Sequence, residues 1–428
     1  MTKTIFGCLG AAAVAFALQF TPANVEAGLF ERCTPCAEVD CYPCDDAGNC
    51  DPCDAVCGPK AKKWFVNGHL EAGFFANGHG QKSTYDGYGG LHGRGADYWS
   101  GNTELLQNTR LTGAQINQVY VSMGRAVDGK RGLDIGGTVD FTWGADAYMV
   151  QAAGLELKEN GLDKDRWGSG DYYSAFAQAY AELAYKRWNV KAGKFATPFG
   201  SSSYKSTDNF FYSWDPSALI VPHTAGGAYA TYAVNNKLSV FGGWVMPDEI
   251  GQSSKYNCVL GGFNWTPSKR LNVRYAFAAG ENTYTGYPFY DEVDVFVHTF
   301  GITSQINKRL KYVFDWTLLN VNAKDDSYRA AAYVLNNEII YQYNKKWAFG
   351  TRFGMLNAND IATGYTGSNE GDWSYVSLGA NWTPNKWLTV KPEVRYDWMD
   401  KTAQYDNPFN GGENTYQVSG GMSAVVKF

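Results

Sequence analysis

Hydrophobic and polar residues alternate along the chain from Trp64 onward, in runs of about ten residues. Successive side chains of a β-strand point to opposite faces, so each run predicts a strand with one apolar and one polar face. Runs of this kind occur at 133–143, 271–277, 310–318 and 347–355. In the clearest one, Leu388, Val390, Pro392, Val394, Tyr396 and Trp398 alternate with Thr389, Lys391, Glu393, Arg395 and Asp397.

The apolar faces have two explanations. In a large secreted β-sandwich they would pack on a second sheet, whereas in an outer-membrane barrel they contact lipid and the charged faces line a wet lumen. The connections favour the barrel, because seven short turns alternate with eight long loops. The short turns fall at 127–131, 186–189, 235–237, 266–270, 307–309, 344–346 and 383–386, and the long loops at 77–111, 147–173, 198–225, 247–256, 281–293, 323–329, 358–372 and 400–414.

This pattern predicts an all-β fold for residues 64–428, a transmembrane antiparallel β-barrel with long extracellular loops and short periplasmic turns. The number of connections indicates about sixteen strands, with fourteen or eighteen as alternatives. Charged residues make up 18% of the chain and the mean hydropathy is −0.35, which argues against a helical membrane protein.

Residues 1–27 have the pattern of a secretory signal peptide. Lys3 precedes the apolar segment Ile5–Phe20, and Val25–Ala27 fits a cleavage site. A retained transmembrane anchor is the alternative, although the segment is short for a span. Residues 28–63 lack periodicity and predict an acidic, cysteine-rich periplasmic appendage. The signal and the barrel together predict a location in the bacterial outer membrane.

The final predicted strand ends at the chain terminus. Apolar residues from Tyr416 to Val426 alternate with polar ones, and the last residue is Phe428. An apolar strand closing on a terminal aromatic resembles the signal that the outer-membrane assembly machinery recognises. We therefore expect that machinery to be a partner and Phe428 to carry the signal.

Several segments resemble the outer-membrane β-barrel porins of the OmpL-like "porin-2" group. The resemblance covers about 64–428, and it implies a porin-like barrel in a lipid bilayer without fixing a substrate. Sixteen-strand porins commonly form trimers, so a homotrimer is expected by analogy. The segments are Gln118–Val121, Gln178–Leu183, Val190–Gly200, Asn209–Ser213, His223–Gly226 and Tyr232–Leu238.

The third long loop, 198–225, is the candidate constriction, because in general-diffusion porins the third loop folds into the pore. A plain external loop is the alternative. Charged residues in a narrow lumen set ion selectivity. The candidates in the loop are Lys205, Asp208, Asp215 and His223, and those on the lumen face are Asp134, Asp140, Glu182, Lys191, Arg274, Lys311, Asp315, Arg352, Lys391, Glu393, Arg395 and Asp397.

The overall charge predicts weak ion selectivity. The chain carries −5 and Cys33–Cys57 alone carries −6, so the remainder carries +1. The five histidines are scattered and no hydrolase, zinc-protease or P-loop motif occurs, so neither an enzyme, a cofactor, a metal nor a nucleic-acid partner is expected. The sequence favours a channel for passive diffusion of small hydrophilic solutes and ions. The alternatives are a structural envelope protein and a surface adhesin.

Seven cysteines lie in the appendage, with paired C-x2-C units that zinc could use. Export places them in an oxidising compartment, which favours disulfides over zinc or free thiols. An odd number leaves one without a partner in the segment, and Cys258 is expected near the opposite, long-loop end of the barrel. The seven are Cys33, Cys36, Cys41, Cys44, Cys50, Cys53 and Cys57.

We therefore predict a disulfide between chains, from this segment to an envelope neighbour. Non-reducing electrophoresis of envelope samples is expected to show a ladder of species that collapses to monomer with reductant. A monomer band under both conditions would contradict the prediction.

Overall fold

A computed structural model of the chain describes residues 64–78, 112–157, 168–169, 172–247, 257–283, 292–324, 329–359, 370–399 and 414–428. The predicted signal peptide and cysteine-rich appendage lie outside these ranges. The strands are β1 (Trp64–Asn77), β2 (Thr112–Arg125), β3 (Asp134–Gly144), β4 (Gly168–Ser169), β5 (Tyr172–Tyr185), β6 (Trp188–Ala196), β7 (Thr224–Ala233), β8 (Leu238–Pro247), β9 (Asn257–Ser268), β10 (Leu271–Thr283), β11 (Glu292–Gln305), β12 (Leu310–Ala323), β13 (Arg329–Gln342), β14 (Trp347–Asn359), β15 (Glu370–Asn385), β16 (Leu388–Met399) and β17 (Tyr416–Lys427).

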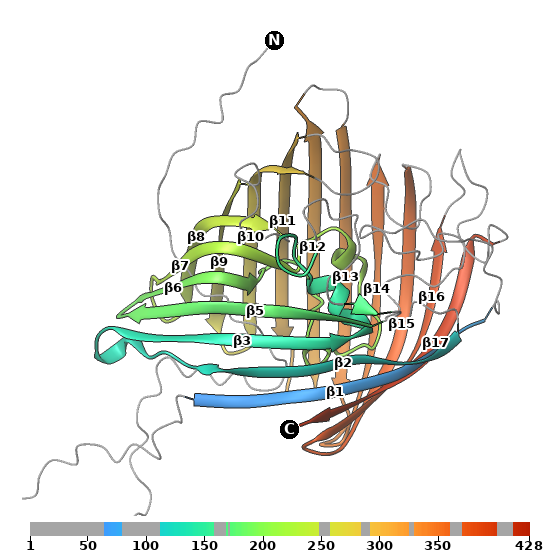
Figure 1. Cartoon of the computed structure of the whole chain (residues 1–428). Helices are drawn as coiled ribbons and strands as arrows, with labels where there is room; N and C mark the ends of the chain where they lie inside the picture. Colours follow the sequence, from blue (N-terminus) through green and yellow to red (C-terminus); the bar gives the residue numbers. More distant parts are fainter. Residues whose placement is uncertain are drawn as a thin grey trace, which may run out of the picture.

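Sixteen of these strands form a closed antiparallel β-barrel, which confirms the predicted fold and strand number. Each long strand pairs with its neighbours in the sequence, and β4 is a two-residue addition to β5. The barrel closes where β17 pairs with β1, in a register that joins His69 to Lys427 (Figure 1). Within the described ranges, the helices are all too short to cross a membrane.

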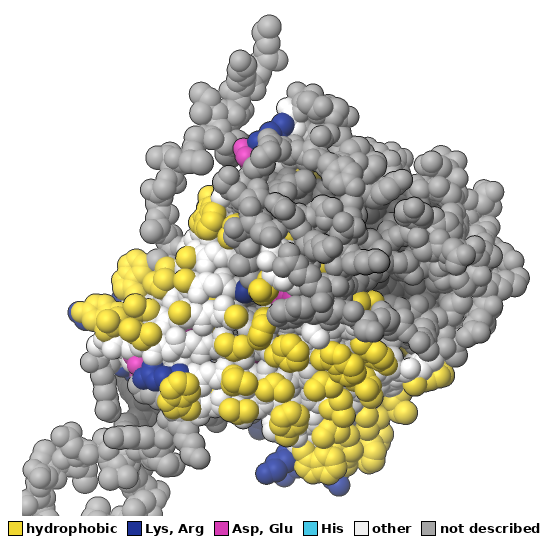
Figure 2. Space-filling view, viewed as in Figure 1, with side chains coloured by type: hydrophobic (Ala, Val, Ile, Leu, Met, Phe, Trp, Pro, Cys, Tyr) yellow, Lys and Arg dark blue, Asp and Glu magenta, His cyan; other side chains and the backbone are white. Residues whose placement is uncertain are grey.

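The barrel wall exposes apolar side chains and buries charged ones, as the sequence pattern predicted. On β16, Val394 is 57% exposed on the outside, whereas its neighbour Arg395 is fully buried on the inside. Figure 2 shows hydrophobic side chains covering the outer face of the barrel. An apolar outer surface with charged groups inside is the arrangement that lipid outside and water inside require.

The short turns share a local design that fixes their shape. In four of them an asparagine side-chain oxygen accepts hydrogen bonds from two backbone N–H groups further along the turn, at 2.7 to 3.1 Å. Such Asx turns replace missing ladder bonds and favour a tight reversal. The asparagines are Asn235, Asn307, Asn344 and Asn385.

The end of the chain completes the barrel. The backbone N–H of Phe428 donates to the Gly68 carbonyl and the Gly68 N–H donates to the Phe428 carbonyl, both at 3.0 Å. The Phe428 ring lies over Gly68, where a Cβ atom would come within 2.5 Å of the ring. Only glycine leaves room for this ring, so the terminal residue and Gly68 form one structural unit.

We predict that Gly68→Ala destabilises the barrel by about 1–3 kcal/mol, because the added methyl overpacks the closing seam. The temperature at which the folded band disappears in heat-modifiability electrophoresis would fall. Gly420→Ala is the matched control, since its Cβ would meet nothing closer than 3.8 Å. Equal shifts for both variants would contradict the role given to this seam.

Candidate functional site

The connection between β6 and β7, residues 197–223, folds into the barrel and is called the inner loop below. It carries two short 3-10 helices, η4 (Ser206–Asp208) and η5 (Pro216–Leu219). Side chains of β2, β10, β13, β14 and β16 hydrogen-bond to it. The loop therefore lies inside the barrel and is held on several sides.

Ser213 is the centre of the strongest attachment. Its hydroxyl donates to Glu393 at 2.6 Å, and its backbone N–H donates to the same carboxylate at 2.8 Å. Arg352 donates to the Ser213 hydroxyl at 2.6 Å and to its carbonyl at 2.9 Å, and Arg395 donates to the hydroxyl at 3.2 Å. Arg395 also donates to both oxygens of Asp397. Charge-assisted bonds of this kind are stronger than neutral ones.

Lys391 and Arg395 of β16 bind backbone carbonyls of the inner loop. Lys391 donates to the carbonyls of Ser206 at 2.5 Å and Asn209 at 2.7 Å. Arg395 donates to the carbonyl of Trp214 at 2.8 Å. Because the loop lacks a sheet partner for these carbonyls, the two side chains satisfy groups whose burial would otherwise be costly.

Aromatic rings of the loop sit in recesses left by wall glycines. The ring of Phe210 covers Gly350, where a Cβ would come within 2.5 Å, and that of Phe211 covers Gly379 at 3.0 Å. The guanidinium of Arg352 lies 4.6 Å from the centre of the Phe211 ring, a cation–π contact. Small wall residues thus shape the surface that receives the loop.

The start of the loop is held by wall strands that precede β14 in the barrel. The Arg274 guanidinium donates to the carbonyl of Gly200, and the Gly200 N–H donates to the Thr299 hydroxyl at 3.2 Å. Asn336 donates to the Ser201 hydroxyl at 2.8 Å. These contacts come from β10, β11 and β13, so they fix the loop on the side facing away from β2 and β3.

A third set of contacts joins the loop to β2 and β3. Gln118 donates to the carbonyl of Tyr204 at 2.7 Å. The Lys205 ammonium lies 3.6 Å from the Asp140 carboxylate and 4.9 Å from the centre of the Tyr120 ring. Tyr120 in turn donates to Asp140 at 2.5 Å.

Asp215 organises the interior of the loop. Its carboxylate accepts hydrogen bonds from the hydroxyls of Ser201 at 2.9 Å and Ser202 at 2.5 Å. It also accepts from the backbone N–H of Ser217 at 2.8 Å and so caps η5. Asp215 is fully buried, and these hydrogen bonds satisfy its carboxyl group within the loop.

Burial favours the neutral forms of His223 and Asp208, two further titratable residues of the loop, through shifts of their pKa values. His223 has its Nε2 3.0 Å from the carbonyl oxygen of Ala218, and burial lowers its pKa to about 4. Burial raises the pKa of the Asp208 carboxyl above its ordinary value. His223 is therefore neutral at pH 7.

The predicted lumen charges fall into two groups. Eight of the twelve hold the inner loop, directly or through an ion pair: Asp140, Arg274, Asp315, Arg352, Lys391, Glu393, Arg395 and Asp397. The other four lie elsewhere on the wall: Asp134 pairs with Arg125 at 2.8 Å, and Lys311 lines the cavity described below. Glu182 and Lys191 lie opposite each other on β5 and β6, where Lys191 contacts Tyr180 and Glu182 accepts from Asn189, away from the loop.

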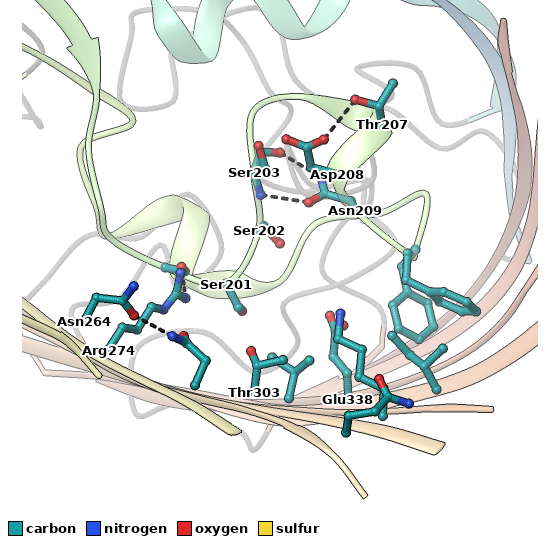
Figure 3. Close-up of a pocket in the computed structure, with 18 of the residues that line it drawn as sticks. Ser201, Ser202, Ser203, Thr207, Asp208, Asn209, Asn264, Arg274, Thr303 and Glu338 are labelled. Atoms are coloured by element: carbon teal, nitrogen blue, oxygen red, sulfur yellow. Dashed lines mark hydrogen bonds between the residues drawn. The ribbon is translucent and has the colours of Figure 1, made fainter. Parts of the chain in front are cut away.

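A cavity of about 1340 Å³ lies between the inner loop and the wall, and extends to the short turns. In Figure 3, Ser201, Ser202 and Ser203 of the loop lie across this space from Thr303 and Glu338 of the wall. Eleven of the described lining residues are Lys or Arg, and two are acidic, Asp208 and Glu338. The basic residues are Lys237, Lys269, Arg270, Arg274, Lys308, Arg309, Lys311, Lys346, Arg352, Lys391 and Lys427.

Sequence reasoning missed two sets of residues. Ser213, Gln118 and Asn336 anchor the loop, but uncharged polar residues give no signal of such a role in a sequence. The basic residues of the short turns had a signal, since a lysine or arginine follows closely in each turn headed by Asn235, Asn307 or Asn344. That repeat predicts turns, but it does not show that their charges meet at one cavity.

A family model described as "Putative beta-barrel porin-2, OmpL-like" matches residues 66–428. The match agrees with the barrel boundaries predicted from the alternating pattern. Among curated proteins, none shows significant sequence similarity to the chain.

Three solved structures share the fold. The trimer form of OmpT, an outer membrane protein of Vibrio cholerae, has 13% identity and a TM-score of 0.53, with 85% of this chain and 99% of that chain covered. The anion-selective porin from Comamonas acidovorans has 9% identity, a TM-score of 0.53 and coverage of 85% and 99%. The outer membrane channel DcaP of Acinetobacter baumannii has 10% identity, a TM-score of 0.53 and coverage of 85% and 97%. At these identities the likeness shows the fold alone.

We predict that Ser213→Ala loosens the inner loop while the barrel stays folded. Removing the hydroxyl leaves buried charged groups incompletely bonded, at a cost of about 1–3 kcal/mol. Hydrogen exchange measured by mass spectrometry would then show protection of residues 197–223 reduced by roughly ten- to a hundredfold. Ser203→Ala is the control, because its hydroxyl accepts only from the Lys205 N–H within the loop. Unchanged exchange in Ser213→Ala would refute this anchor.

Proposed function

The chain belongs to the family of β-barrel porins described as "Putative beta-barrel porin-2, OmpL-like", and from this premise we propose that it forms a water-filled channel for passive diffusion of small hydrophilic solutes and ions. Membership and fold make it an outer-membrane channel protein. The finer statement, passive diffusion, is supported by a polar cavity that is open at the short turns and narrowed by the inner loop.

The inner loop is the proposed constriction, and this is the observation that carries the proposal. A cavity of about 1340 Å³ lined by hydroxyls, amides and charges lies beside this loop, which supports a water-filled path past it. The hydrogen bonds to β10, β14 and β16 fix its position, so the gap has a constant width. A fixed polar gap selects solutes by size and charge, because it offers water-like partners without closing.

The remaining parts of the proposal follow from the sequence. Residues 1–27 direct export, and the periplasmic appendage at 28–63 cross-links to envelope neighbours through its odd cysteine. Phe428 serves as the assembly signal, and its pairing with Gly68 at the seam supports a role at barrel closure. A homotrimer is proposed by analogy with sixteen-strand porins. Within the described ranges the one cysteine is Cys258, a buried free thiol on β9.

Planar-bilayer recording tests the channel directly. The purified protein is expected to insert in discrete conductance steps with a linear current–voltage relation. Replacing residues 203–211 with a short Gly-Ser linker would roughly double the step size, because the constriction limits conductance. The size of the largest polyethylene glycol that enters would rise in parallel.

Heat-denatured protein and detergent alone are the controls for this recording. A folded protein without conductance would favour the structural or adhesive alternatives. Conductance that does not change after loop replacement would leave the channel but remove the inner loop as its constriction.

A further inference from the structure

Cations line one half of the short-turn end of the cavity. Four successive short turns, from β7–β8 to β13–β14, place Lys or Arg side chains on the cavity wall. The Asx turns at Asn235, Asn307 and Asn344 fix the backbone from which four of these groups project. We call the set Lys237, Lys269, Arg270, Lys308, Arg309 and Lys346 the turn ring.

The turn ring is not neutralised by neighbouring acids. In the described part of the chain, no carboxylate lies within 4.0 Å of any nitrogen of these six side chains. The deeper arginines differ, because Arg274 pairs with Asp315 at 2.8 Å and Arg352 with Glu393 at 3.4 Å. An ion entering from the short-turn side therefore meets unpaired positive charge first.

Two more lysines, Lys311 on β12 and Lys427 on β17, extend this charge from the mouth toward the inner loop. The acids of the cavity do not balance it. Asp208 is 9% exposed and lies within the loop, and Glu338 lies near the opposing charges of Lys311 and Arg352. Basic groups on the cavity wall thus exceed acidic ones by nine, since eleven face two.

The uncharged lining fits partly hydrated anions. Ser203, Asn264 and Thr303 line the cavity with hydroxyl and amide groups, and Asn264 lies beside Arg274 (Figure 3). Such groups donate hydrogen bonds to an anion that has lost part of its water, and the basic groups supply the attraction. The arrangement is a vestibule that concentrates anions beneath the inner loop.

We propose that the channel prefers anions, small inorganic anions and small carboxylates being the substrate class, and that the turn ring sets this preference. The inference rests on the proposed channel function. It replaces the weak selectivity expected from net charge, because an ion responds to the charges that line its path. At physiological ionic strength, exposed charges are screened beyond about 8 Å. Charges that face the cavity therefore act on an ion within it more strongly than charges on the outer side of the turns.

The short turns offer a matched set of variants. The test protein carries Lys269→Glu, Lys308→Glu and Lys346→Glu, three turn-ring residues. The control protein carries Lys130→Glu, Lys345→Glu and Lys386→Glu, which are exposed on short turns and do not line the cavity. The formal charge change is identical, and Lys345 and Lys346 even share a turn.

Reversal potentials in a tenfold KCl gradient give the readout. The unmodified channel is expected to pass chloride over potassium by at least about threefold. The test protein should fall to a ratio near one or below, and the control protein should stay within about 1.5-fold of the unmodified one. Heat-modifiability of all three proteins confirms that they are folded. If the triple test variant does not fold, Lys346→Glu and Lys345→Glu give the same comparison singly.

Each outcome decides one point. Conducting channels with a chloride-to-potassium ratio near one would overturn the anion preference and leave the channel function intact. Absence of conductance in the folded, unmodified protein would overturn the channel function itself. An equal loss of preference in test and control proteins would show that general surface charge, and not the turn ring, sets selectivity.

Discussion

Every backbone N–H and C=O group that faces hydrocarbon must find a partner within the protein, because lipid offers none and each unmet group costs several kcal/mol. The ladder from β1 to β17 meets this requirement only when it closes on itself. The end of the chain must therefore lie beside its beginning, which is where Phe428 pairs with Gly68. The inverted pattern of apolar outside and charged inside follows from the same closure, since the lumen is the one wet surface left.

Closure creates an interior in which charges interact strongly. The inner loop enters this space with backbone groups that have no sheet partner, and the wall meets them with Arg352, Lys391 and Arg395. A buried charge without a partner is costly, and breaking a buried pair costs about 3–5 kcal/mol. The wall cations are stable there because carboxylates and loop carbonyls surround them. The loop and the wall charges therefore stabilise each other.

The strands could be predicted from the sequence because their signal is local. Alternation over ten residues reports the environment of the two faces, and the turn residues mark each reversal. The position of the inner loop could not be predicted, because its anchoring contacts join distant parts of the sequence. Ser213 hydrogen-bonds to Glu393, which lies 180 residues further along the chain. Alternation placed Glu182 and Lys191 on the polar side as surely as Arg352, but no local feature told which charges would meet the loop. Nor could the sequence predict that glycines of the wall leave space for the aromatic rings of the inner loop, because the two are far apart in the chain.

The same distinction separates net charge from selectivity. Net charge sums residues wherever they lie, including acids paired with arginine and charges outside the turns. An ion in the cavity responds to the groups within a screening length, and there the pairs formed by Arg274 and Arg352 largely cancel. What remains is the turn ring, which the asparagine-headed turns present on one half of the mouth. A barrel close to neutral overall can therefore favour one ion sign, since the fold places its unpaired charges along the path.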